Sequence, residues 1–233
     1  MSRGVKRRIT IQLDGRDTEV SGVFHRPADA RSLYVLAHGA GANMEHAFMS
    51  EVAVRLYTDG IATLRYNFPY MEAAGQTGRR ARPDSPALLT ATVRAAVTRA
   101  AKLAKDLPLV AGGKSMGGRM TSQAQAAEPL PGVKGLAFLG FPLHAPGREG
   151  TSRAAHLDNV MIPMLFLQGT RDALADLDLM RDVCGALGRR AKLAVIDGAD
   201  HSFKVLKRSG RTPEDVMDEI VSTTGRFVGR VTR

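Results

Sequence analysis

The chain has 233 residues, of which 44% are hydrophobic and 24% charged, a composition typical of a globular protein with one sizeable core. Tryptophan is absent and aromatic residues make up only 5%, which argues against a surface for stacking bases or sugars. The single cysteine, Cys184, excludes an internal disulfide framework and is expected to be a buried small residue in a reducing compartment. We expect a single domain over residues 1–233.

The formal net charge is +10, but the basic residues are scattered along the chain. A nucleic-acid surface requires clustered basic side chains, so we interpret the charge as a solvated surface and expect no nucleic-acid partner. The basic N-terminus leads into the alternating residues 8–13 instead of an apolar signal segment. No window approaches the roughly 18 apolar residues of a membrane span, and we expect a cytoplasmic protein without a membrane partner.

Strands and helices are predicted to alternate along the chain. The strands are expected at residues 8–13, 19–25, 33–37, 61–66, 107–111, 133–141, 164–168 and 192–196. The helices are expected at 46–58, 85–105, 116–127, 173–187 and 213–228, with loops at 67–84 and 142–158. This alternation indicates βαβ units and a mostly parallel sheet, in which reactive groups gather beyond the carboxyl ends of the strands.

One segment combines a strand, a glycine-rich turn and a helix: Gly113-Lys114-Ser115-Met116-Gly117. A sharp strand-to-helix turn brings two backbones close together, so it needs small residues two positions before and after the central one. Such a turn exposes Ser115 at a helix N-terminus, where unpaired N–H groups favour negative charge. The sequence therefore predicts Ser115 as a nucleophile. A phosphate-binding P-loop would need glycine at position 108, where the chain has proline.

A serine nucleophile needs a base to take its proton and a carboxylate to orient that base. His201 follows the strand predicted at 192–196, and Asp172 follows the strand predicted at 164–168. The chain order Ser115, Asp172, His201 is the order found in α/β-hydrolases. Four further candidates are weaker. His144 has no later acid in the expected order, and Asp176 and Asp178 are expected too deep in the next helix. Asp200 is adjacent to the base and poorly placed to orient it.

The oxyanion of acyl transfer requires two hydrogen-bond donors. The backbone N–H of Met116 is expected to be one of them. The other is expected from the glycine-rich loop after residues 33–37, with Ala40 N–H as the first choice and Gly41 as the second. His38, at the start of this loop, is expected to brace it.

Further side chains are candidates for substrate contact: His38, Lys114, His144, Arg79, Arg80 and Arg82. The three arginines follow the strand at 61–66 and should border the same rim as Ser115. One hypothesis is that they attract an anionic acyl group or a phosphate. The alternative is a solvated loop with no role in binding.

Four segments together resemble the α/β-hydrolase superfamily, and its small dienelactone-hydrolase-like branch in particular: His38-Gly39-Ala40-Gly41, residues 113–118, Gly169-Thr170-Arg171-Asp172 and Asp200-His201-Ser202-Phe203. The segment Arg65-Tyr66-Asn67-Phe68-Pro69-Tyr70 resembles a subgroup of bacterial hydrolase-family proteins related to a scaffold subunit of a eukaryotic histone-acetyltransferase complex. The resemblance extends over about residues 8–230.

The resemblance implies an α/β-hydrolase fold: an eight-stranded, mostly parallel sheet with helices on both faces. It also implies no metal and no organic cofactor. Dienelactone hydrolases proper use a cysteine nucleophile, so their named activity is not carried over to a chain with Ser115. The loop at 142–158 is too short for a large lid domain, which favours an open, shallow site.

The leading hypothesis is a serine hydrolase that cleaves a small-molecule carboxylic ester or thioester through an acyl-enzyme. Two alternatives stay open: a binding or scaffold protein with little or no catalysis, and amide or peptide hydrolysis. The sequence leaves the substrate open, as well as the choice between monomer and homodimer.

Overall fold

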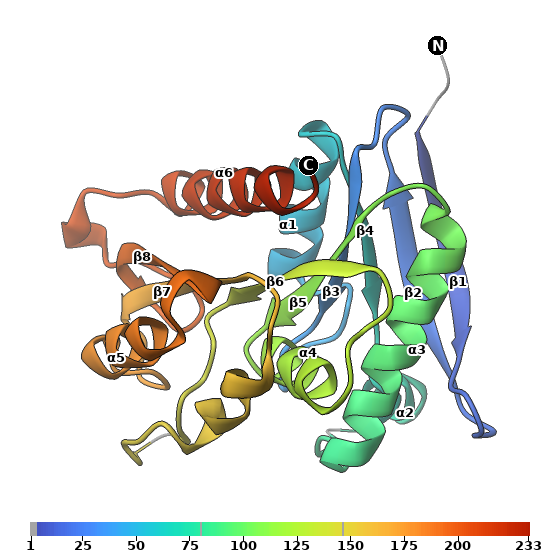
Figure 1. Ribbon diagram of the computed structural model, residues 1–233, viewed down its shortest axis with the longest axis horizontal. Helices are drawn as coiled ribbons and strands as arrows, with labels where there is room; N and C mark the ends of the chain where they lie inside the picture. Colours follow the sequence, from blue (N-terminus) through green and yellow to red (C-terminus); the bar gives the residue numbers. More distant parts are fainter. Residues whose placement is uncertain (1–3, 80, 146) are drawn as a thin grey trace.

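The computed structural model describes residues 4–79, 81–145 and 147–233, which form one eight-stranded sheet with helices on both faces (Figure 1). The strands are β1 Val5–Gln12, β2 Glu19–Arg26, β3 Ser32–Ala37, β4 Ile61–Tyr66, β5 Leu109–Lys114, β6 Val133–Leu139, β7 Met164–Arg171 and β8 Ala191–Asp200. The helices are α1 Ala47–Thr58, α2 Pro69–Thr77, α3 Pro86–Ala104, α4 Met116–Ala127, α5 Leu177–Leu187 and α6 Pro213–Val231. Three 3₁₀ segments complete the structure: η1 Ser152–Asn159, η2 Gly188–Arg190 and η3 Lys207–Ser209.

The strand order is β1-β2-β4-β3-β5-β6-β7-β8. β1 and β2 pair antiparallel, β2 pairs antiparallel with β4, and the strands from β4 to β8 are parallel. The mostly parallel sheet predicted from the alternation of elements is therefore confirmed. No helix in the described part of the chain has the length and apolar character needed to cross a bilayer.

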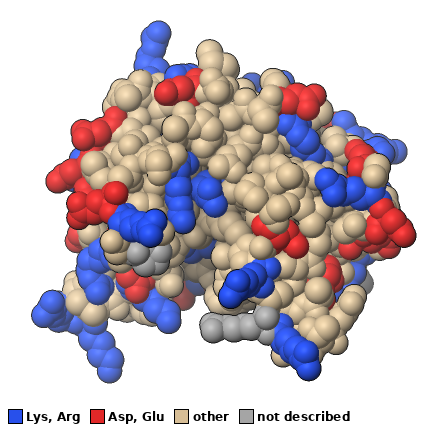
Figure 2. All heavy atoms as spheres, turned by 90° about the horizontal axis from the view of Figure 1, so that it is seen from below, with Lys and Arg blue, Asp and Glu red and all other residues tan. Residues whose placement is uncertain are grey.

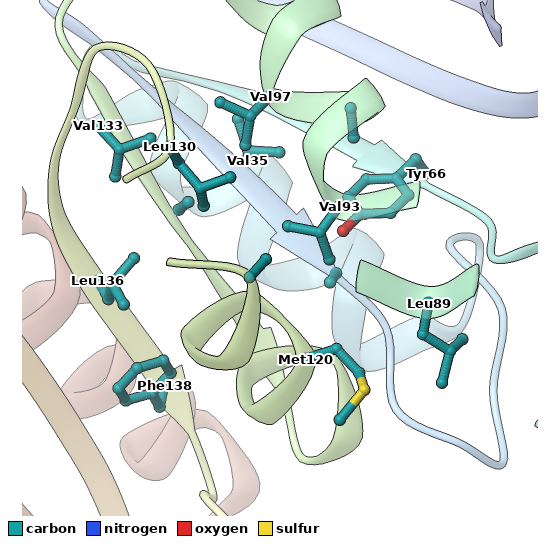
Figure 3. Packing of buried hydrophobic residues seen from close by; sticks show 14 of the residues in the cluster. Val35, Tyr66, Leu89, Val93, Val97, Met120, Leu130, Val133, Leu136 and Phe138 are labelled. Carbon is teal, nitrogen blue, oxygen red and sulfur yellow. The ribbon is translucent and has the colours of Figure 1, made fainter. Parts of the chain in front are cut away.

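The core forms two layers, one on each face of the sheet. In β3, Leu33 and Val35 face the layer that contains α3, α4 and α5, whereas Tyr34 and Leu36 face α1 and α6. Figure 3 shows the first layer, in which side chains of α3 and α4 meet those of the central strands. Because both faces are covered, the central strands read as continuous apolar runs, and each fully buried Leu or Val side chain contributes about 1.5–3 kcal/mol.

The segment predicted as a loop over residues 67–84 contains the helix α2, so that prediction is wrong. Pro69 occupies the first helical position, and Gly78 ends the helix with φ of 65°. Proline at the start of a helix and glycine at its end are both favourable. A composition that suggests a loop therefore marks the two ends of a short helix.

Two further boundaries differ from the prediction near the site. β5 continues through Gly112 and Gly113, beyond the end predicted at residue 111. The neighbouring strand lies so close that only glycine fits, because a Cβ atom on Gly112 would lie 1.8 Å from the Ala137 carbonyl oxygen. α5 begins four residues later than predicted, because Asp176 caps it by accepting from the N–H groups of Asp178 and Leu179. Asp176 thus precedes the helix in which it was expected to lie. The predicted loop at 142–158 contains most of η1.

Candidate active site

Ser115 lies at the turn between β5 and α4, with φ of 50° and ψ of −117°. This backbone conformation is unfavourable for a residue with a side chain, and the close packing around the turn enforces it. A Cβ atom on Gly117 would lie 2.5 Å from the His38 carbonyl oxygen, and one on Gly113 would lie 2.2 Å from the Ala37 carbonyl oxygen. The turn therefore has small residues on both sides of Ser115, as predicted, and the close approach of the two backbones is the reason.

The structure brings Ser115, His201 and Asp172 into one chain of hydrogen bonds. Ser115 Oγ lies 2.8 Å from His201 Nε2, and His201 Nδ1 lies 2.7 Å from Asp172 Oδ2. The Asp172 carboxylate is fully buried and also accepts from Gln168 Nε2 and from the Leu174 N–H. With the Nδ1 proton directed at this carboxylate, Nε2 is free to accept the serine proton.

The turn that carries His201 is fixed from two sides. Asp200 Oδ1 accepts from the backbone N–H groups of Ser202 and Lys204, at 2.8 and 2.9 Å. From the other side, Lys114 Nζ donates to the His201 carbonyl oxygen at 2.6 Å and lies 5.2 Å from the centre of the Phe203 ring. Burial lowers the pKa of Lys114 to about 8. Lys114, predicted as a substrate contact, thus also ties the nucleophile turn to the His201 turn.

The loop after β3 lies directly against the nucleophile. A Cβ atom on Gly39 would lie 3.6 Å from both the Lys114 carbonyl oxygen and Ser115 Cβ. In the part of the chain that the structure describes, the backbone N–H groups of Ala40, Gly41 and Met116 have no hydrogen-bond acceptor. Three free donors therefore lie in the nucleophile turn and in the loop packed against it, the two segments from which the sequence predicts the oxyanion donors.

His38 is fully buried behind this loop and has both ring nitrogens engaged. Its Nδ1 donates to the Gly39 carbonyl oxygen at 2.8 Å, and its Nε2 accepts from the Phe68 N–H at 3.0 Å. Burial lowers its pKa to about 4, so the ring is neutral near pH 7. This geometry fits the predicted bracing role and leaves neither ring nitrogen of His38 free for a hydrogen bond to substrate.

Residues 65–70 form hydrogen bonds that hold the loop after β3 in place, a role that the sequence did not predict. Arg65 Nη1 donates to the Met44 carbonyl oxygen at 2.6 Å, and Asn67 Oδ1 accepts from the Met44 N–H at 2.9 Å. Tyr70 Oη donates to the Ala40 carbonyl oxygen at 3.0 Å. The only hint in the sequence is the presence of polar residues directly at the end of a buried strand.

A hollow of about 330 Å³ opens beside the nucleophile. It is lined by residues from the loop after β3, from α1 and from the nucleophile and histidine turns: Gly39, Ala40, Gly41, Ala42, His46, Phe48, Met49, Lys114, Ser115, His201 and Ser202. The sequence analysis missed the contribution of His46, Phe48, Met49 and Ser202. Their place in the chain is the signal that could have found them. His46, Phe48 and Met49 lie in or just before the helix that follows the glycine-rich loop, and Ser202 directly follows His201.

Among the described residues, the remaining predicted substrate contacts do not line this hollow. Arg79 and Arg82 are solvent-accessible and do not line it, and Arg80 lies outside the described residues. His144 is buried with Nδ1 against the Ala145 carbonyl oxygen at 3.0 Å, and it does not line the hollow either. Figure 2 shows the molecule from below the view of Figure 1, and on this face Lys and Arg are spread among Asp and Glu. This view agrees with the interpretation of the net charge as a scattered, solvated one.

A serine, a histidine and a buried aspartate joined in this way, at the carboxyl ends of parallel strands, form the arrangement found in serine hydrolases of the α/β-hydrolase fold. A family model described as an alpha/beta hydrolase domain matches residues 30–229, and the chain belongs to this family. Among the described residues, no group of three His, Cys, Asp or Glu side chains is placed to hold a metal ion.

Several solved structures are similar over nearly the whole chain. The dienelactone hydrolase of Anabaena variabilis is 19% identical with a TM-score of 0.77, and each chain is covered to 100%. An alpha-beta serine hydrolase homologue from Coxiella burnetii is 18% identical with a TM-score of 0.72, covering 93% of this chain and 96% of the other. A cold-adapted esterase from an Arctic intertidal metagenomic library is 20% identical with a TM-score of 0.70, covering 98% and 94%. These similarities establish the α/β-hydrolase fold.

Proposed function

We propose that this protein is a serine hydrolase that cleaves a carboxylic ester or thioester through an acyl-enzyme on Ser115. The observation that carries the proposal is the continuous path from Ser115 Oγ to His201 Nε2, at 2.8 Å, and from His201 Nδ1 to Asp172 Oδ2, at 2.7 Å. The family supports a hydrolase, and the names of two similar structures, a dienelactone hydrolase and an esterase, favour ester bonds.

The first half of the reaction forms the acyl-enzyme. Ser115 Oγ attacks the carbonyl carbon while its proton passes to His201 Nε2, and Asp172 stabilises the imidazolium that results. The backbone N–H groups of Met116 and of Ala40 or Gly41 hold the oxyanion. When the tetrahedral intermediate collapses, the bond to the alcohol oxygen or thiol sulfur breaks, and the leaving group takes the proton from His201.

The second half returns the enzyme to its starting state. A water molecule gives a proton to His201 Nε2 and attacks the acyl carbon. The second intermediate then collapses with cleavage of the bond to Ser115 Oγ, which recovers its proton from His201, and the carboxylic acid leaves. The hollow of about 330 Å³, with Phe48 and Met49 in its wall, favours a short or medium apolar group on the substrate.

The decisive test is covalent labelling with a fluorophosphonate probe, followed by a series of 4-nitrophenyl esters of increasing acyl length. We expect labelling of the wild-type protein at Ser115, no labelling of Ser115→Ala, and turnover that declines for long acyl chains. Circular dichroism of both proteins provides the folding control. A folded wild-type protein that neither reacts with the probe nor cleaves any ester would instead support the scaffold hypothesis.

A further inference from the structure

Gln168 is a fully buried polar side chain near the carboxyl end of β7, and the catalytic acid Asp172 follows it by one turn of the chain. Its Nε2 donates to Asp172 Oδ2 at 2.5 Å, and the same oxygen accepts from His201 Nδ1 at 2.7 Å. Its Oε1 is buried without a hydrogen-bond partner among the described residues. An unpaired buried acceptor is destabilising, so packing alone would favour an apolar side chain at this position. The bond to Asp172 is the interaction that offsets this cost.

The orientation of the Gln168 amide follows from the charge of Asp172. An ionised carboxylate can only accept hydrogen bonds, so the amide must present its nitrogen, and not its oxygen, to Asp172 Oδ2. A hydrogen bond to the charged form of a carboxyl group stabilises that form. Gln168 therefore stabilises the anion that the imidazolium of His201 requires during catalysis.

The same bond connects Asp172 to the sheet. Asp172 Oδ1 accepts from the Leu174 N–H at 2.8 Å, but Leu174 belongs to the same loop as Asp172 and moves with it. Gln168, in contrast, is part of β7, at a point where this strand is packed tightly against the end of β8. A Cβ atom on Gly169, the next residue, would lie 2.2 Å from the Ala199 carbonyl oxygen. Gln168 is thus the donor that holds the carboxylate from a rigid element.

The charges around Asp172 leave this role to hydrogen-bond donors. No lysine or arginine in the described part of the chain forms an ion pair with Asp172, and His201 is its partner instead. Lys114 and Asp200 are the other charged groups nearby, because the negative charges of Asp172 and Asp200 both act on the Lys114 ammonium. Among side chains, the direct contacts of the carboxylate are therefore His201 and Gln168.

We propose that Gln168 is a positioning residue that keeps the Asp172 carboxylate ionised and aligned with His201 Nδ1; this inference rests on the function proposed above. Because Gln168 and His201 share Oδ2, the amide compensates part of the negative charge that attracts the imidazolium. Loss of the amide should leave the carboxylate freer to move and should strengthen its attraction for the imidazolium. His201 would then be less well aligned and would stay protonated to a higher pH.

The test replaces Gln168 with methionine, which is similar in length and has no donor, and measures hydrolysis of 4-nitrophenyl butyrate from pH 5 to pH 9. In Gln168→Met the acid limb of kcat/KM should move about one unit toward higher pH. On the plateau, kcat should fall about 10-fold with KM unchanged. Gln168→Leu carries the same expectations and takes the place of Gln168→Met if that variant does not fold.

Gln125→Met is the matched control. Gln125 is another buried glutamine, and it lies near the end of α4 farthest from Ser115. Its Oε1 accepts from the Leu130 N–H at 2.9 Å, so the variant also loses a buried hydrogen bond. The melting temperature of Gln125→Met should fall, but the pH profile should stay that of the wild-type protein.

A second measurement does not depend on turnover. NMR of protein with isotope-labelled histidine follows the titration of the His201 ring, whose signals are identified by their absence in His201→Gln. The midpoint should lie at higher pH in Gln168→Met than in the wild-type protein and in Gln125→Met. An unchanged midpoint and acid limb, or equal shifts in the two variants, would overturn the positioning role. A wild-type protein that cleaves no ester and resists the fluorophosphonate probe, with the midpoint still shifted in Gln168→Met, would contradict the proposed hydrolase function and leave the coupling of Gln168 to His201 supported.

Discussion

Replacement of Lys114 with methionine tests whether the position of His201 depends on the Lys114 ammonium. The variant keeps an unbranched side chain of similar length and removes the hydrogen bond of 2.6 Å to the His201 carbonyl oxygen. A hydrogen bond to a charged group contributes about 1.5–3 kcal/mol. If this energy holds His201 in place as the transition state forms, kcat should fall about 10- to 100-fold with little change in KM.

The same variant should be at least as stable as the wild-type protein at pH 7. The pKa of Lys114 is lowered by burial from 10.5 to about 8, so the folded chain binds a proton there less readily than the unfolded chain. The wild-type protein therefore loses stability as the pH falls from 10.5 through 8, and below 8 the full cost is present. Methionine has no such cost, so the stability gain of the variant should be larger at pH 7 than at pH 10.

The assay combines steady-state hydrolysis of 4-nitrophenyl butyrate with thermal unfolding, both measured between pH 6 and pH 10. Lys204→Met is the matched control, because this exposed lysine belongs to the same turn and its side chain has no described partner. Unchanged kcat in Lys114→Met would refute the positioning argument. A parallel loss of activity and melting temperature would also refute it, because that result would indicate a merely structural role.

Three other substitutions test neighbouring parts of the site. Asp172→Asn should lower kcat by about 10⁴-fold, because the amide favours the wrong tautomer of His201, and stopped-flow hydrolysis of 4-nitrophenyl esters measures this loss. Tyr70→Phe removes the 3.0 Å hydrogen bond to the Ala40 carbonyl oxygen and should lower kcat about fivefold with KM unchanged; a change in KM alone would contradict a bracing role. Because φ at Ser115 is 50°, Ser115→Gly should be about 1 kcal/mol more stable in urea unfolding than Ser115→Ala, and equal stability would argue against backbone strain there.

The meeting of Ser115, Asp172 and His201 could be predicted because each follows a strand. The carboxyl ends of parallel strands lie at one edge of a sheet, so three such positions come together whatever the details of packing. The alternation of elements also predicts the sheet itself. Both inferences depend on local patterns and on a general rule of topology, and neither requires knowledge of side-chain contacts.

The residues that support the site could not be found in this way. The hydrogen bond from Arg65 to Met44 joins positions 21 residues apart and depends on where a buried side chain points. The same limit applies to the packing of η1 against α4, where His156 Nε2 lies 2.7 Å from Ser122 Oγ, 34 residues away in the chain. Proline and glycine misled the prediction at α2 because the same residues serve loops and helix ends.

The close backbone contacts at Gly113 and Gly117 have a consequence for motion. Both residues touch the end of β3, and the loop that carries Ala40 and Gly41 begins there. A thermal displacement of β3 must therefore move the nucleophile and the oxyanion donors in the same direction and by similar amounts. The distance between Ser115 Oγ and the N–H groups that stabilise the oxyanion is then insensitive to fluctuations of the sheet. This holds although the oxygen and the donors belong to different segments of the chain.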